Sequence, residues 1–214
     1  MSNDHFIGRK HLKHLKTLSI VRIKKSVSEK GLKHLWLNIE KLPFLSSFSL
    51  CFIGESVDDP RETLEKSLPI YELLVRLKSL SKLKLDILNF FDNIDEELFY
   101  LSQSLRRLPL LSCLVLDFRH AYKLTQRGIS NLCGLFEVNK ILTHLSLNFT
   151  NAPKLQTEGL LILFGGLKQL PSLTALKLDF DSCPNLEGKE IQKLFDKIRS
   201  LKHISNVQLI HKDK

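Results

Sequence analysis

Two eight-residue stretches, LSCLVLDF at residues 111–118 and LTHLSLNF at residues 142–149, each contain a side chain that could do chemistry. Cys113 is the third residue of the first stretch, and His144 is the third residue of the second. If the stretches form adjacent parallel strands in register, the Cβ atoms of these two residues lie about 5 Å apart. With the carboxylate of Asp117 farther along the same strand face, this is the kind of arrangement that a cysteine nucleophile needs.

The surroundings of this pair do not favour catalysis. An open sheet provides no nucleophile elbow, and no helix N-terminus is placed to stabilise an oxyanion. A polar face made of several strands also brings some cysteine, histidine and acid together by chance. We therefore predict that the protein is not an enzyme. A catalytic Cys113 would have to react with a mild alkylating agent faster than a free thiol does.

Metal and cofactor motifs are absent from the sequence. His11 and His14 are three residues apart and could share a helix face, but two histidines without a third ligand do not define a metal site. HExxH, CxxC, the P-loop and GxGxxG do not occur. Gly165 and Gly166 fall within a stretch of helical periodicity, where glycine permits a bend or close packing. We expect no cofactor and no metal.

The eight-residue pattern is repeated along the chain. Apolar residues stand at positions 1, 4 and 6 of each copy, and phenylalanine often stands at position 8. The copies start near Leu15, Leu45, Leu80, Leu111, Leu142, Leu173 and Ile204. The last four intervals are 31 residues long, and the extra residues of the second unit fall in an expected acidic loop at residues 54–62. Because apolar and polar residues alternate, each copy predicts a short strand with one buried face.

A helix is predicted in the second part of each unit. There the apolar residues are three and four apart, as at Leu160, Leu163 and Leu167, which is typical of an amphipathic helix. Ser28 and Thr125 are expected to cap such helices. One strand and one helix cannot bury a core alone, but stacked units can. Helices pack about 8–10 Å apart and strands about 4.8 Å apart, so the stack must curve with its strands on the concave side.

The pattern LxxLxLxF…LTxxGxxxL resembles the leucine-rich-repeat proteins of the long, helix-containing, ribonuclease-inhibitor-like kind. The resemblance covers residues 8–210. It implies an α/β solenoid shaped as a curved horseshoe, with about seven parallel strands on the concave face and α-helices on the convex face. The whole chain, 1–214, would be a single domain, with residues 1–14 as a basic N-terminal half-repeat.

The turn after each strand departs from the family pattern. The family usually has asparagine or cysteine at position 9 or 10, whereas the residue pairs found here are Arg119 and His120, Thr150 and Asn151, and Asp181 and Ser182. We therefore expect the turn to be held differently from unit to unit. The phenylalanines at position 8 are expected in the core, because they continue the inward parity of positions 4 and 6. Position 2 is serine or threonine in six of seven units, which predicts a structural ladder of hydroxyl groups.

The outward-facing positions of the sheet are the predicted binding surface. Its candidate protein-binding residues are Lys82, Lys84, Asp86, Asp117, His144, Asn148, Lys177 and Asp179. The outward-facing columns, positions 2, 3, 5 and 7 of the copies, contain no tryptophan, tyrosine or phenylalanine, although aromatic anchors dominate most protein interfaces. Their mixed charge suits a charged protein segment, and the acidic column would repel a phosphate backbone.

The net charge of +9 is concentrated near the N-terminus. Residues 1–39 contain nine lysines and arginines against two acidic residues. A basic patch is predicted at Arg9, Lys10, Lys13, Lys16, Arg22, Lys24 and Lys25. Such a patch can bind nucleic acid or an anionic surface, or it can be a solvated edge that maintains solubility.

The remaining features point to an intracellular protein. The four cysteines form no CxxC pair, no apolar run reaches the roughly 20 residues of a membrane span, and the N-terminus lacks an apolar signal core. We expect a cytoplasmic or otherwise intracellular, non-enzymatic protein–protein interaction module or scaffold subunit. It would bind protein partners through the concave face or the exposed solenoid ends, where an open strand edge also allows self-association. The alternative is binding of nucleic acid or an anionic surface through the basic patch.

Overall fold

The computed structural model describes residues 12–24, 29–53, 70–88 and 93–212 of the chain. Within these residues, seven parallel strands form one sheet in sequence order. The strands are β1 (Thr17–Lys24), β2 (Ser47–Ile53), β3 (Lys82–Leu88), β4 (Cys113–Asp117), β5 (His144–Asn148), β6 (Ala175–Asp179) and β7 (Asn206–Ile210). The helices are α1 (Glu29–Ile39), α2 (Ile70–Arg76), α3 (Ile94–Leu105), α4 (Gln126–Val138), α5 (Thr157–Leu167) and α6 (Gly188–Arg199), preceded by the 3-10 helix η1 (Leu12–His14).

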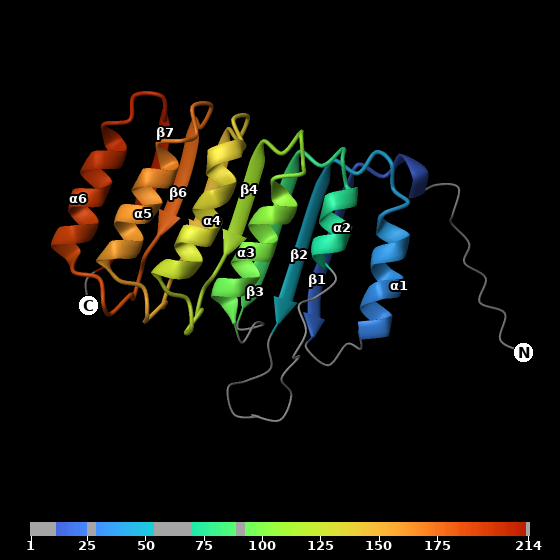
Figure 1. The fold of residues 1–214 in the computed structure, drawn as a ribbon, viewed down its shortest axis with the longest axis horizontal. Helices are drawn as coiled ribbons and strands as arrows, with labels where there is room; N and C mark the ends of the chain where they lie inside the picture. Colours follow the sequence, from blue (N-terminus) through green and yellow to red (C-terminus); the bar gives the residue numbers. More distant parts are fainter. Residues whose placement is uncertain (1–11, 25–28, 54–69, 89–92, 213–214) are drawn as a thin grey trace, which may run out of the picture.

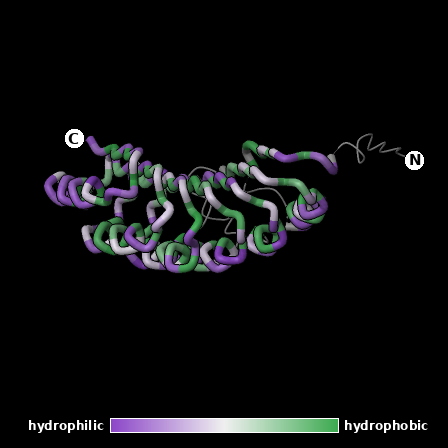
Figure 2. The backbone as a smooth tube through the Cα atoms, turned by 90° about the horizontal axis from the view of Figure 1, so that it is seen from above, coloured by the Kyte–Doolittle hydropathy of each residue, from purple (hydrophilic) through white to green (hydrophobic). Residues whose placement is uncertain are grey.

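Strands and helices alternate along the chain and form two layers (Figure 1). The helices all cover the same side of the open sheet, because crossovers between neighbouring parallel strands share one hand and the strands follow each other in sequence order. The array bends as a shallow arc with the strands on its inner side (Figure 2). The predicted α/β solenoid is thus confirmed. The acidic stretch at residues 54–62 and the expected cap Ser28 lie outside the described residues.

The repeat numbering read from the sequence matches the strand register. Leu114 of β4 pairs with Leu145 of β5, which pairs with Leu176 of β6, so position 4 of each unit meets position 4 of the next. The pairing is continuous from β2 to β7, and an irregularity between Ile20 and Ile23 interrupts it only in β1. A slip of one residue would turn every leucine out of the core, so burial enforces this register.

The position 8 phenylalanines form a column inside the core, as predicted. Phe118, Phe149 and Phe180 are each 0% exposed. Their rings stack with centroids 5.6 Å apart from Phe118 to Phe149 and 5.4 Å apart from Phe149 to Phe180. Phe52 of β2 is also buried. Offset stacking adds to the hydrophobic stabilisation from ring burial, so this column helps to hold neighbouring units at the strand spacing.

A ladder of hydroxyl groups runs across the start of the strands. The Oγ of Ser112 donates to the carbonyl oxygen of Ser81 at 3.3 Å, and the Oγ1 of Thr143 donates to the carbonyl oxygen of Ser112 at 3.0 Å. The same bond links all consecutive units, through Ser46, Ser81, Ser112, Thr143, Thr174 and Ser205. These residues therefore have a structural role, as their recurrence predicted.

One local bond fixes where α4 begins, and one glycine fixes how α5 packs against α4. Thr125 caps α4 by accepting a hydrogen bond from the backbone N–H of Arg127 at 3.1 Å, as expected. In α5, a Cβ added to Gly166 would lie 2.6 Å from the Cys133 Sγ of α4. A Cβ added to Gly165 would meet nothing within 4 Å. Gly166 is therefore required for close helix packing, whereas Gly165 is not.

This difference predicts opposite effects of two adjacent substitutions. Gly166→Ala should destabilise the protein by about 1–3 kcal/mol, because the new methyl group overlaps Cys133. Gly165→Ala should stabilise it by about 0.5–1 kcal/mol, because alanine loses less backbone entropy in a helix than glycine does. Urea unfolding followed by circular dichroism measures both. Equal effects of the two substitutions would contradict the assignment of Gly166 to the helix interface.

Candidate functional site

The eight predicted binding residues lie on one face of four neighbouring strands, β3 to β6. The ladder pairs them in three rows across the strands, which are Lys82–Cys113–His144–Ala175, Lys84–Val115–Ser146–Lys177 and Asp86–Asp117–Asn148–Asp179. We call this surface the concave face. The strand register therefore brings together residues that are up to 97 positions apart in the chain.

The three rows differ in exposure. Lys82, Lys84, His144 and Lys177 are exposed, whereas the four residues of the third row are half-buried. A depression of about 220 Å³ lies over β4 to β7, where the side chains of Cys113, Ser146 and Ala175 are small. Lys177 borders this depression. Small side chains between longer ones allow a bound chain to approach the sheet closely.

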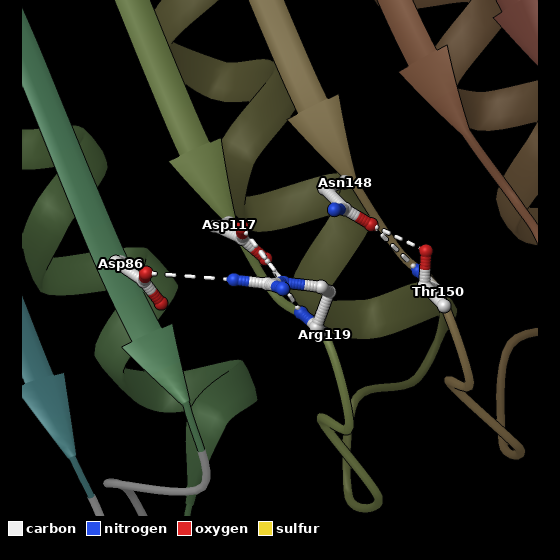
Figure 3. Close-up of polar contacts among 5 residues, drawn as sticks. All are labelled: Asp86, Asp117, Arg119, Asn148 and Thr150. Carbon is white, nitrogen blue, oxygen red and sulfur yellow. Dashed lines mark hydrogen bonds and ion pairs between the residues drawn. The ribbon is translucent and has the colours of Figure 1, made fainter.

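Three residues of the third row hold the turns that follow β4, β5 and β6. The Oδ1 of Asp117 accepts the backbone N–H of Arg119 at 3.1 Å, and the Oδ1 of Asp179 accepts that of Asp181 at 3.0 Å. Asn148 Oδ1 accepts both the N–H of Thr150 at 2.9 Å and its hydroxyl group at 2.7 Å (Figure 3). Each side chain thus satisfies a backbone donor two residues later, as aspartate and asparagine do in Asx turns.

The expectation that the turn differs from unit to unit is wrong for these three units. His120, Asn151 and Ser182 all adopt the left-handed conformation, with φ of 59°, 57° and 56°. The backbone N–H of His120 donates to the carbonyl oxygen of Thr150 at 2.9 Å, and that of Asn151 donates to Asp181 at 2.9 Å. Position 7 supplies the side-chain bond that the family places at position 9 or 10. The turn can therefore keep one geometry although positions 9 and 10 vary.

Arg119 belongs to this surface as well, although the sequence did not predict it as a site residue. Its Nε lies 2.9 Å from Asp117 Oδ2, and its terminal nitrogen lies 3.6 Å from Asp86 Oδ2 on the neighbouring strand (Figure 3). Burial, followed by the charge of Asp117, raises the pKa of Asp86, and Arg119 opposes this rise. The sequence signal was the Asp-x-Arg spacing, but the reach from Arg119 to Asp86 depends on the strand pairing. The carboxylates of the third row therefore interact mainly with the protein's own turns and with Arg119.

The Cys113 and His144 pair is adjacent, but its environment does not activate the thiol. The two residues are direct partners in the ladder between β4 and β5. Burial raises the pKa of Cys113, and the charge of Lys82 only partly offsets this effect. The Nδ1 of His144 lies 2.8 Å from the hydroxyl oxygen of its own neighbour, Thr143. A nucleophilic cysteine needs a lowered pKa, so the physical setting favours the thiol form.

Only part of the predicted basic patch lies within the residues that the structure describes. Lys13 of η1 and Lys16, just before β1, are exposed. Arg22 and Lys24 belong to β1, while Arg9, Lys10 and Lys25 lie outside the described residues, as does His11. His14 stacks on the ring of Phe44 at a centroid distance of 6.1 Å. The described part of this patch is therefore at the β1 end of the sheet, away from β3 to β6.

Within the part of the chain that the structure describes, no group of three or more histidine, cysteine, aspartate or glutamate side chains is placed to hold a metal ion. No described helix has the length and apolar character needed to cross a membrane.

The strand register, the helix order and the leucine columns define the class of the fold, an α/β solenoid of the leucine-rich-repeat type. No protein-family model matches the sequence. No curated protein matches it either. A solved structure described as "Leiomodin-1 Actin-Binding Site 2 (ABS2)" is similar with a TM-score of 0.49 and 16% sequence identity, over 67% of this chain and 78% of that chain. A similarity this distant says nothing about the partner of the present protein.

The structural role of the third row predicts the effect of Asn148→Ala. The substitution removes the acceptor of two hydrogen bonds and leaves the N–H of Thr150 without its partner, so the free energy of unfolding should fall by about 1–3 kcal/mol. Ser146→Ala on the same strand should change it by less than about 0.5 kcal/mol. Urea unfolding tests both variants. An Asn148→Ala variant as stable as the Ser146→Ala variant would contradict the turn assignment.

The burial of the thiols predicts their order of reactivity. Near neutral pH, Cys113 should react with iodoacetamide more slowly than glutathione does, because its raised pKa reduces the thiolate fraction. Cys133 should be slower still, because burial raises its pKa to about 12. Peptide mapping by mass spectrometry gives the rate at each site, and protein unfolded in guanidinium serves as the control. A Cys113 that reacts faster than glutathione would restore the nucleophile hypothesis.

Proposed function

We propose that this protein is a non-enzymatic protein-interaction module that binds an acidic segment of a partner protein on its concave face. We further propose that it belongs to the long, ribonuclease-inhibitor-like kind of leucine-rich repeat, on the basis of the 31-residue spacing and the helix in each unit. The observation that carries the binding proposal is the difference in exposure between the charged rows. The lysines are exposed, whereas the carboxylates are half-buried; Asp117 and Asp179 accept bonds from the protein's own turns, and Asp86 lies 3.6 Å from Arg119.

The charge of the concave face supports an acidic partner segment. Lys82 and Lys84 lie on β3, and Lys177 lies on β6, on either side of the strands with the small side chains. Carboxylates of a bound segment could pair with these lysines while its backbone passes over Cys113 and Ser146. Charges at the rim of an interface mainly steer association and choose the partner, which suits recognition of an acidic sequence.

The aspartates of the concave face make a protein segment a better ligand than nucleic acid. Asp86, Asp117 and Asp179 remain beside the lysines, and Arg119 is the cation that contacts two of them. A regular phosphate backbone would place its charges against this row as well as against the lysines. A protein segment can avoid the conflict, because its acidic residues can be spaced to meet only the lysines.

The outer strands of the described sheet, β1 and β7, are further candidate contact surfaces for a scaffold role. Leu18 and Ile20 of β1, and Val207 and Leu209 of β7, are only half-buried. The corresponding leucines of the inner strands are buried. A further surface packed against either outer strand, from a partner or a second copy, would complete this burial.

The concave-face proposal predicts a preference for acidic peptides. A library of short random peptides, selected for binding to the protein, should become enriched in aspartate and glutamate. The double variant Lys84→Glu/Lys177→Glu should weaken binding of the selected peptides about tenfold, because it replaces attraction by repulsion. Fluorescence anisotropy with labelled peptides measures the dissociation constants.

The matched control is Lys189→Glu/Lys193→Glu, which makes the same change in net charge on α6 of the convex side. This control should bind the selected peptides as the wild type does. Selected peptides without an acidic bias, or equal affinity of the two double variants, would overturn the proposal. RNA and acidic vesicles, titrated at low and high salt, test the alternative site at the basic patch, where binding should fall steeply with salt.

A further inference from the structure

An aromatic cluster is exposed on the convex side of the solenoid, between α2 and α3. Phe99 and Tyr100 of α3 are 44% and 41% exposed. Their rings meet edge to face with centroids 5.5 Å apart, and the ring of Tyr71 of α2 lies 6.0 Å from that of Tyr100. Phe99 and Tyr100 therefore form an exposed aromatic surface on the helical side of the solenoid, and the half-buried ring of Tyr71 adjoins it.

The core does not require Phe99 and Tyr100. The buried stripe of α3 includes Leu98 and Leu101, which flank the two aromatic residues and are almost fully buried. Phe99 and Tyr100 lie next to this stripe and leave apolar surface in water. Aromatic side chains are enriched at the centres of protein interfaces, because they combine a large apolar area with few rotatable bonds. The concave columns contain no such residue.

Carboxylates lie directly beside the rings. The phenol of Tyr100 donates to Glu96 Oε1 at 3.3 Å, and the phenol of Tyr71 donates to Glu97. Glu97 is half-buried, and burial raises its pKa. Glu96 is exposed, and its other oxygen accepts the side-chain N–H of Asn93 at 2.7 Å. These bonds orient the Tyr100 ring and place the exposed carboxylate of Glu96 next to it.

No ion pair between described residues joins a cation to Glu96. Arg76 of α2 forms an ion pair with Glu40 at 2.9 Å. Arg127, at the corresponding position of α4, forms no ion pair with Glu96 among the described residues. Arg106 and Arg107 follow the opposite end of α3, whose last turn has no basic residue. Within the described residues, Glu96 is thus an exposed acid without an ion pair, on a chain whose net charge is +9.

We propose that Glu96, Phe99 and Tyr100 form a second interaction surface, which binds an arginine- or lysine-bearing segment of a partner protein with the cation against the rings. The charge of Glu96 and the electron-rich ring faces select a cation, and the apolar area of Phe99 accepts the aliphatic part of its side chain. Arginine fits best, because its planar guanidinium group can stack on a ring while it donates to a carboxylate. This surface does not depend on the concave face.

The test uses a soluble peptide of alternating glycine and arginine, and the same peptide with uncharged citrulline in place of arginine. Nuclear magnetic resonance titration of the labelled protein should show shifts at Glu96, Phe99 and Tyr100 with the arginine peptide. The variant Phe99→Ala/Tyr100→Ala should weaken binding at least about tenfold. Glu96→Gln should weaken it about two- to fivefold. Tyr100→Phe keeps the ring and should retain most of the affinity.

The matched controls are Leu161→Ala and Glu158→Gln of α5, which change an exposed apolar residue and an acid at the corresponding positions of another unit. Neither control should alter binding, and neither should the uncharged substitution Ser146→Ala on the concave face. Equal affinity for the citrulline peptide, shifts confined to other surfaces, or no binding at millimolar peptide would overturn the proposal. Self-association that Phe99→Ala/Tyr100→Ala abolishes, detected by sedimentation, would overturn the choice of a foreign partner in favour of a second copy.

Discussion

One constraint underlies the whole structure, namely that a unit of one strand and one helix can bury its apolar face only against the next unit. The core is therefore a set of columns that run across the units, such as the stack of Phe118, Phe149 and Phe180. The polar groups follow the same rule. The hydroxyl ladder and the turn bonds each join one unit to the next or close the turn beside it. Stability and register consequently have the same origin.

This constraint also determines which side chains remain available for binding. On the concave face, Asp117, Asn148 and Asp179 are occupied by the turns, so Lys84 and Lys177 offer the accessible charge. On the convex face, the buried stripe of each helix supplies the core, and the residues beside it are free to differ between units. The two candidate surfaces therefore have opposite charge and lie on opposite sides of the sheet.

The sequence predicted the elements that depend on a repeated local pattern. Each strand begins at the third residue of an LxxLxLxF copy, the phenylalanines are core, and Thr125 caps its helix. The turn was predicted incorrectly, because the side chain that holds it had been assigned to the binding surface. Nothing in the period of the sequence separates an aspartate that faces solvent from one that accepts the N–H group two residues later.

The sequence by itself determined the repeat, the alternation of strand and helix, and the face of each strand that is buried, because these depend on spacings within one unit. Only the tertiary structure decided which polar residues form contacts with neighbouring units and are therefore less available for binding. Arg119 reaches Asp86 across the strand pairing, and Tyr71 reaches Glu97 across a helix interface. Such contacts join residues about 30 positions apart. They depend on the exact stacking of two units and have no counterpart in the local pattern.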